Sequence, residues 1–142
     1  MKRKILLIGF DAQMYKLISK ELENCFSLES IPSTGDIDGR SPDAILLYVS
    51  DFKAGLYSLD EIKACDNDIQ VLVVVAQEIT SIKTAVTLTQ HGVFDFLSMP
   101  IPAKALEIII PRMIEKRTDA LKMKIVKTIP QIHGKYSSLF VV

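Results

Sequence analysis

Three carboxylates of the sequence are placed where they could share chemistry. Asp11, Asp51 and Glu78 each lie within three residues of the end of a short apolar run. If these runs are parallel strands, their carboxyl ends meet at one edge of a sheet, where open α/β sheets bind ligands. Carboxylate oxygens are also the ligands that Mg²⁺ prefers. The simpler interpretation is that these are solvated loop carboxylates, and we favour it because isolated surface acids seldom prove functional.

Other catalytic or cofactor-binding patterns are missing from the sequence. The segment 9–12 (GFDA) lacks the GxGxxG spacing of a loop that binds phosphates. No Ser/His/Asp or Cys/His set emerges from the spacing, and Cys25 and Cys65 belong to no metal-binding pattern. We therefore expect neither an enzyme nor a bound cofactor or metal, and we expect both thiols to be buried or half-buried. A flavodoxin-like binder of a small ligand remains an alternative.

The apolar runs themselves predict strands that are buried on both faces. With 142 residues, 49% of them hydrophobic, the chain has the usual length of one domain and enough apolar side chains for a sizeable core. Runs that lack period-two alternation and end at turn residues are typical of parallel strands covered by helices. We expect such strands at 5–8, 44–49 and 69–76, and the segments 26–31 and 93–97 can supply a second and a fifth strand.

Segments with helical spacing lie between and after these strands, as in a doubly wound α/β sheet. Helices are expected at 13–24, 53–64 and 81–90, and a last helix should begin at Pro102 and run toward Lys124. The segment 32–42 contains two prolines and two glycines, so the helix expected in this crossover should be short or absent.

The charge balance argues against binding to nucleic acid or a membrane. Seventeen basic and seventeen acidic side chains cancel, so no overall field attracts nucleic acid or an anionic bilayer. No apolar stretch approaches the length of a membrane span, and the first residues do not form a signal peptide. We therefore expect a cytoplasmic protein with no direct contact to nucleic acid or membrane.

Four segments resemble the response-regulator receiver domains of two-component signalling, the CheY-like family. The segments 4–8 (KILLI), 41–47 (SPDAILL) and 69–76 (IQVLVVVA) are similar to the first, third and fourth strands of that family. The segment 91–100 (HGVFDFLSMP) resembles its "GA-x-D-[YF]-L-x-K-P" ending. The resemblance implies a bacterial phosphorelay protein with a flavodoxin-like, five-stranded parallel sheet in the order 2-1-3-4-5. Helices would cover both faces, and the last helix would be extended.

The resemblance also indicates where a phosphorylation site would lie, and its acidic residues are replaced in this chain. The phospho-accepting aspartate of the family corresponds to Tyr48. The two acidic residues that hold Mg²⁺ correspond to Gly9 and Phe10, and only the next acidic position is kept, as Asp11. Mg²⁺ requires hard oxygen ligands, which the side chains of Gly9 and Phe10 do not supply.

The remaining family positions are apolar here. The hydroxyl residue that grips the phosphoryl group corresponds to Val75, the lysine before proline to Met99, and the aromatic switch to Phe96. A dianionic phosphoryl group would lie unpaired in such a pocket, so we predict a degenerate receiver that is not phosphorylated. The ring of Tyr48 should fill the space against Phe10, Val75 or Met99. A displaced acceptor at Asp51, with Mg²⁺, remains the alternative.

The expected domain limits and partners follow from the same resemblance. Residues 1–120 would form the receiver-like domain, and residues 121–142 a C-terminal extension or linker toward a possible output domain. The chain would then be a regulatory module that acts by contact with a protein partner or with its own output domain. Receivers commonly signal through their fourth helix, fifth strand and fifth helix. Those elements correspond to 81–90, 93–97 and the last helix, and we predict a homodimer through this surface.

Overall fold

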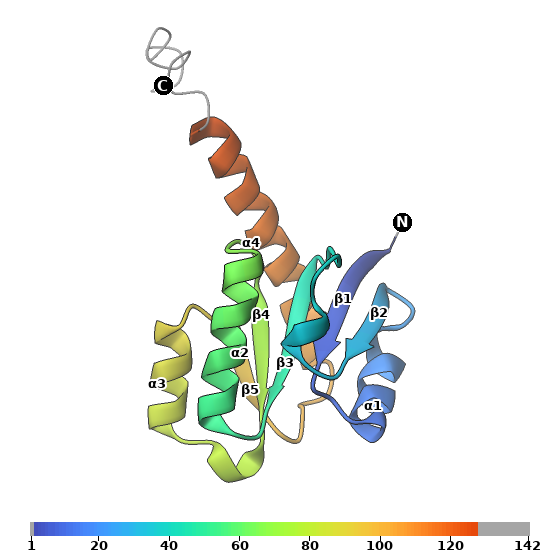
Figure 1. Ribbon diagram of the computed structural model, residues 1–142. Helices are drawn as coiled ribbons and strands as arrows, with labels where there is room; N and C mark the ends of the chain where they lie inside the picture. The colour runs from blue at the N-terminus through green and yellow to red at the C-terminus, as the bar shows by residue number, and fades with distance from the viewer. Residues whose placement is uncertain (1, 128–142) are drawn as a thin grey trace, which may run out of the picture.

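The structure is a computed structural model that describes residues 2–127 and contains a parallel sheet with helices on both faces (Figure 1). The strands are β1 (Arg3–Ile8), β2 (Phe26–Ile31), β3 (Ala44–Val49), β4 (Val71–Val75) and β5 (Asp95–Ser98). The helices are α1 (Ala12–Leu22), α2 (Phe52–Cys65), α3 (Ile82–Gln90) and α4 (Ala105–Lys127), with short 3-10 turns η1 (Thr34–Asp36) and η2 (Gln77–Ile79).

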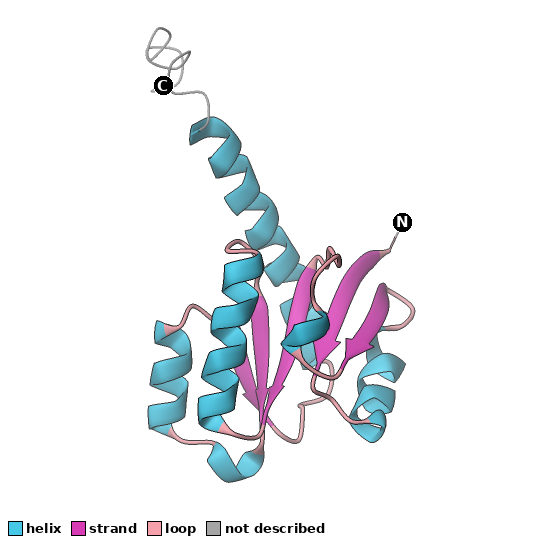
Figure 2. Ribbon diagram, in the orientation of Figure 1, coloured by secondary structure: helices cyan, strands magenta, loops and turns pink. Residues whose placement is uncertain are grey.

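The five strands pair in the order β2-β1-β3-β4-β5, as the sequence predicts. All pairs are parallel, so the carboxyl ends of the strands lie on one edge of the sheet, at the bottom of Figure 2. One core layer packs beneath α1 and α4, and the other beneath α2 and α3. The molecule therefore has three layers, with the sheet in the middle.

Strand β3 shows why an apolar run without alternation forms this sheet. Ala44, Leu46 and Tyr48 belong to the core layer beneath α1 and α4, whereas Ile45, Leu47 and Val49 belong to the layer beneath α2 and α3. Successive side chains of a strand point to opposite faces, so a strand that is covered on both sides needs apolar residues at every position.

The crossover between β2 and β3 contains only the 3-10 turn η1 where a full helix would otherwise lie, as predicted. Thr34, which is buried, donates its hydroxyl hydrogen bond to Glu61 Oε1 of α2 at 2.8 Å. This bond fixes the short turn against the neighbouring helix.

The last helix begins later than the sequence predicts, because Pro102 lies in the preceding loop. The N–H group of Ala105 donates to the carbonyl of Pro102 at 3.2 Å, and Lys104 has a φ of 62°. A residue in this left-handed region interrupts a right-handed helix, so α4 begins only at Ala105. The extended C-terminal helix itself is confirmed, and it crosses residue 120, the predicted domain limit, without a break. The predicted linker after residue 127 lies outside the described residues.

The prediction that both thiols are buried or half-buried is wrong. Cys25 and Cys65 are both exposed, because Cys25 follows the end of α1 and Cys65 is the last residue of α2. On α3, Ile82 is 85% exposed and Val86 is 50% exposed, although both belong to its apolar spacing. That helix therefore presents apolar side chains to solvent as well as to the core.

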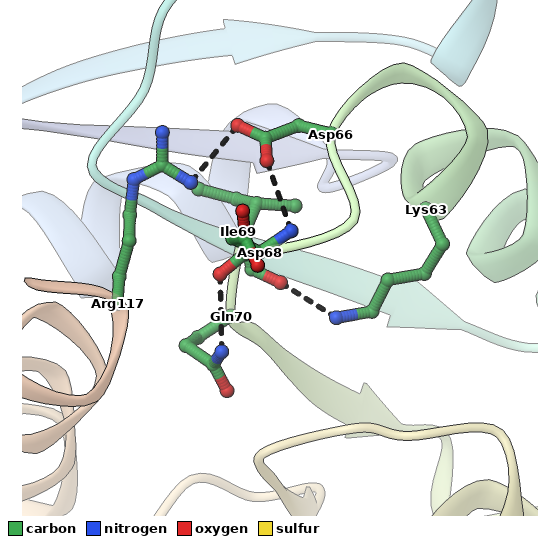
Figure 3. Close-up of polar contacts among 6 residues, drawn as sticks. All are labelled: Lys63, Asp66, Asp68, Ile69, Gln70 and Arg117. Atoms are coloured by element: carbon green, nitrogen blue, oxygen red, sulfur yellow. Dashed lines mark hydrogen bonds and ion pairs between the residues drawn. The ribbon is translucent and has the colours of Figure 1, made fainter. Parts of the chain in front are cut away.

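Helix α4 is tied to the turn between α2 and β4 by a small polar cluster (Figure 3). Arg117 of α4 forms an ion pair with Asp66, with 2.9 Å between Nη1 and Oδ2. The other carboxylate oxygen of Asp66 accepts the N–H group of Asp68 at 3.0 Å, and Lys63 Nζ donates to the carbonyl of Ile69 at 2.7 Å. Beyond this cluster, α4 extends away from the sheet (Figure 1).

Among residues 2–127, no helix is both long enough and apolar enough to cross a membrane.

Candidate functional site

The predicted site lies at the carboxyl edge of the sheet, where four strands end side by side. Tyr48 pairs with Val74 and Val75 pairs with Ser98 in the strand register. The N–H group of Met99 donates to the carbonyl of Val75 at 2.9 Å. The positions that the sequence singles out are therefore brought together by the parallel arrangement of the strands.

Two aromatic rings meet at this edge. The centroids of the Phe10 and Tyr48 rings are 5.7 Å apart, and their planes are tilted by 46°. Phe10 is 8% exposed, and Tyr48 is half-buried against the same core layer as Met99. Val75 is fully buried in the other core layer, beneath α2 and α3. The predicted contact of the tyrosine ring is thus made with Phe10.

Gly9 has a backbone conformation that disfavours any side chain. Its φ is +82°, and its N–H group donates to the carbonyl of Ile31 at 3.0 Å. A Cβ atom at this position would lie 3.5 Å from the carbonyl oxygen of Tyr48. Because only glycine adopts this region without cost, glycine suits the sharp turn that the chain makes after β1.

The carboxylates that remain near the edge act as helix caps. Asp11 precedes α1 and its Oδ1 accepts the N–H group of Met14 at 2.8 Å. Asp51 precedes α2 and its Oδ1 accepts the N–H group of Lys53 at 3.0 Å. Aspartate is a preferred N-cap because its oxygen satisfies an N–H group of the first turn that lacks a helical partner. Glu78 is exposed in η2.

The arrangement at this edge is an apolar ring contact flanked by two carboxylates that cap helices. Phe96 is half-buried and packs against the core beneath α2 and α3. No group of three or more histidine, cysteine or acidic side chains is placed to hold a metal ion in the part of the chain that the structure describes.

Comparisons with known proteins give matches in structure only. No protein-family model and no curated protein matches the sequence. Among solved structures, the signal receiver domain of a putative LuxO repressor from Vibrio parahaemolyticus has a TM-score of 0.75 and 22% identity, with 87% of this chain and 98% of that chain covered. A CheY-like receiver domain from Methanospirillum hungatei has a TM-score of 0.73 and 14% identity, with 84% and 99% covered.

A longer protein matches this chain over part of its length. NtrX from Brucella abortus, in complex with ADP, matches with a TM-score of 0.75 and 22% identity, covering 87% of this chain and 30% of that one. The chain has a receiver fold. In this receiver fold, Tyr48 is the next-to-last residue of the central strand β3, beside the ends of β1 and β4.

One polar pair at this edge of the sheet was not predicted from the sequence. The hydroxyl oxygens of Thr80 and Ser98 lie 2.8 Å apart, and Thr80 also donates to the carbonyl of Ala76 at 3.1 Å. Thr80 lies in the loop after β4, and Ser98 is the last residue of β5. The pairing of β4 with β5 could have predicted that these two residues lie close together. The pair bridges the loop after β4 to the end of β5.

Proposed function

We propose that this chain is a degenerate receiver, a regulatory module that works by protein contact and takes no phosphoryl group on an aspartate. The ring contact between Phe10 and Tyr48 carries this proposal, because it puts two aromatic side chains where the family has an acidic residue and the acceptor. The module would act in the cytoplasm of a bacterial cell, on a protein partner or on its own output domain.

The chemistry of phosphoryl transfer supports the proposal. Transfer to a carboxylate needs a nucleophilic oxygen, a divalent ion against the developing charge, and donors for the phosphoryl oxygens. Phe10 and Met99 contribute apolar atoms to this edge instead. Asp11 and Asp51, the nearest carboxylates in sequence, are engaged with the first turns of α1 and α2.

The surface formed by α3, β5 and α4 is the contact face that we favour. Ile82 and Val86 expose large apolar side chains on α3, next to β5, which is the edge strand of the sheet. Lys116 of α4 lies 5.6 Å from the centre of the Phe94 ring, just before β5. A mixture of exposed apolar and charged side chains along an unpaired edge suits a protein partner, and we propose that a second copy of this chain binds here.

Intact-mass measurement tests the loss of phosphorylation. The full chain is incubated with acetyl phosphate and Mg²⁺, and no mass increase is expected. A stoichiometric gain of one phosphoryl group would contradict the proposal. If the gain disappears in Asp51→Asn and persists in the exposed control Asp60→Asn, the displaced acceptor is the correct alternative.

Sedimentation of the full chain over a range of concentrations tests self-association. The expected result is a concentration-dependent dimer that is weakened by Ile82→Ser and Val86→Ser. Tyr57→Ser is the matched control, because Tyr57 is 67% exposed on α2, outside this surface. A strict monomer at high concentration, or equal weakening by the control, would rule out the dimer while leaving the absence of phosphorylation untouched.

A further inference from the structure

A groove opens between α1 and the segment that links β5 to α4. Its cavity volume is about 240 Å³. Met14 and Leu17 of α1, Met99, Ile101 and Ala103 of the linking segment, and Leu106 of α4 contribute to its walls. We call this cavity the α1 groove. Leu17 is 61% exposed, so the apolar wall reaches the surface and the groove is open to an incoming side chain.

One carboxylate interrupts the apolar wall. Glu21, near the end of α1, is the one charged residue among those that line the α1 groove in the described chain. Burial raises the pKa of this carboxyl, and the charge of Glu107 raises it further, while backbone hydrogen bonds from Glu107 and Lys104 lower it. The carboxyl places one negative charge on an otherwise apolar wall, and a cation that enters the groove would offset that charge.

The chemistry of the α1 groove selects one kind of occupant. The apolar walls favour an aliphatic chain, because burial of methylene groups away from water is favourable. The lone carboxylate favours a cation with hydrogen-bond donors and disfavours an anion, since Glu107 adds a second negative charge nearby. A lysine side chain combines a four-carbon stem with an ammonium group that has three donors.

We propose that the α1 groove binds a lysine side chain of a partner polypeptide, with its stem against Leu17 and Met99 and its ammonium group on Glu21. The α1 groove is lined by α1 and by the segment that runs from β5 into α4, whereas the exposed apolar side chains of the proposed dimer surface, Ile82 and Val86, belong to α3. The test of the groove therefore has a different readout from the tests of the dimer and of phosphorylation.

Short peptides and backbone NMR shifts of the full chain test the proposal. The probes are three acetylated and amidated tripeptides, Leu-Lys-Leu, Leu-norleucine-Leu and Leu-Glu-Leu. The lysine peptide should shift the amide signals of residues 17–22 and 101–106 saturably. The norleucine peptide should bind roughly ten-fold more weakly, the loss expected for one charged hydrogen bond, and the glutamate peptide should not bind.

Three variants separate the α1 groove from unspecific binding. Glu21→Gln should make the lysine and norleucine peptides bind equally, whereas Glu23→Gln, which removes an exposed carboxylate just after α1, should leave the difference intact. Ala103→Leu should block both peptides by filling the groove, and its unshifted spectrum elsewhere would show that it is folded. n-Hexylammonium tests whether the groove prefers a free amine. Tighter binding of this compound than of the lysine peptide would overturn the assignment to a polypeptide. Equal binding of the lysine and norleucine peptides to the unmodified chain, or shifts confined to α3, would also overturn it.

Discussion

The rings of Phe10 and Tyr48 lie 5.7 Å apart, so each shields the other from solvent at the ends of β1 and β3. Tilted aromatic pairs at this separation contribute about 0.5–1.5 kcal/mol beyond the area they bury. This edge of the sheet is therefore stabilised by apolar packing. Charge placed in this position should be harmful to the fold.

Tyr48→Asp should destabilise the chain and should not create a phosphorylation site. The change removes the ring contact and puts a carboxylate next to Phe10 and Met99, so we expect a loss of about 2–4 kcal/mol in the free energy of unfolding. Urea unfolding measures this loss. Tyr57→Asp on the exposed face of α2 is the control, with an expected loss of less than about 1 kcal/mol.

Intact-mass measurement tests whether Tyr48→Asp can be phosphorylated. If the family resemblance holds at these positions, Tyr48→Asp still lacks the two acids, the hydroxyl and the lysine, because Gly9, Phe10, Val75 and Met99 are unchanged. With acetyl phosphate and Mg²⁺, its mass should stay constant. A stoichiometric mass gain in this variant would show that the proposed loss of phosphorylation rests on Tyr48 alone and not on the other replaced positions.

Gly9→Ala should cost stability because of its backbone conformation and not because of crowding. Its φ is +82°, while the nearest atom to an added Cβ is 3.5 Å away, an ordinary contact. The expected loss is about 1–2 kcal/mol, the cost of the left-handed region for a side chain. Gly39→Ala, at φ +81° in open space, should lose a similar amount. Gly35→Ala, which has no such φ, should change the unfolding midpoint little; an equal loss there would contradict this explanation.

Gly55→Ala should be destabilising for the opposite reason. Gly55 is buried in α2, and an added Cβ would lie 2.5 Å from Cγ1 of Val49, which is closer than atoms pack. Alanine favours a helix by about 1 kcal/mol over glycine, but overpacking costs about 1–3 kcal/mol. The double variant with Val49→Ala should lose less than the sum of the two single losses in urea unfolding. Strict additivity would show that the two side chains do not compete for space.

Glu21 should make stability depend on pH. Burial raises the pKa of this carboxyl above its ordinary value of 4.5, so the folded chain holds the proton more tightly than the unfolded chain. The fold therefore gains stability as the pH falls from the raised pKa toward 4.5 and loses it as the pH rises through that window. Glu21→Gln should raise the urea midpoint relative to the unmodified chain above the window, and the advantage should vanish below it. An advantage of constant size across the pH range would contradict this cause.

Much of the fold could be predicted from the sequence because the sheet is buried on both faces. The ends of β2 and β3 agree with the prediction, and in β3 this is because an unbroken apolar run stops at turn residues. The start of α4 was wrong because the left-handed Lys104, and not Pro102, decides where the helix begins. The exposure of Ile82 was missed because periodicity shows that a face is apolar but not that another element covers it.

The candidate site was only partly predictable. Parallel strands end at one edge, so the meeting of Phe10 with Tyr48 follows from topology alone. The roles of Asp11 and Asp51 as caps depend on where each helix starts, a boundary that sequence patterns leave uncertain by a few residues. The α1 groove forms because α1 lies next to the segment 99–106, and no local sequence pattern predicts that two such distant segments meet.

Asp66→Asn should loosen the attachment of α4. Removing one charge of the pair with Arg117 should change the overall stability by about 1 kcal/mol or less, because both side chains are partly exposed. The local effect should be larger, since the first turns beyond Arg117 have no sheet beneath them. Amide hydrogen exchange of residues 118–123 should become faster, while Asp60→Asn on α2 leaves it unchanged. Unaltered exchange in Asp66→Asn would mean that packing alone holds the helix.

Because α4 continues through Arg117 without a break, the domain has a lever built into its last helix. Ten residues of helix beyond that point span roughly 15 Å, so a tilt of about 10° at the ion pair would move the far end by roughly 3 Å. Any segment attached to that end would change direction together with the helix, because α4 is one continuous helix from Arg117 to Lys127. A small displacement of the turn between α2 and β4 would therefore produce a larger displacement at the end of α4.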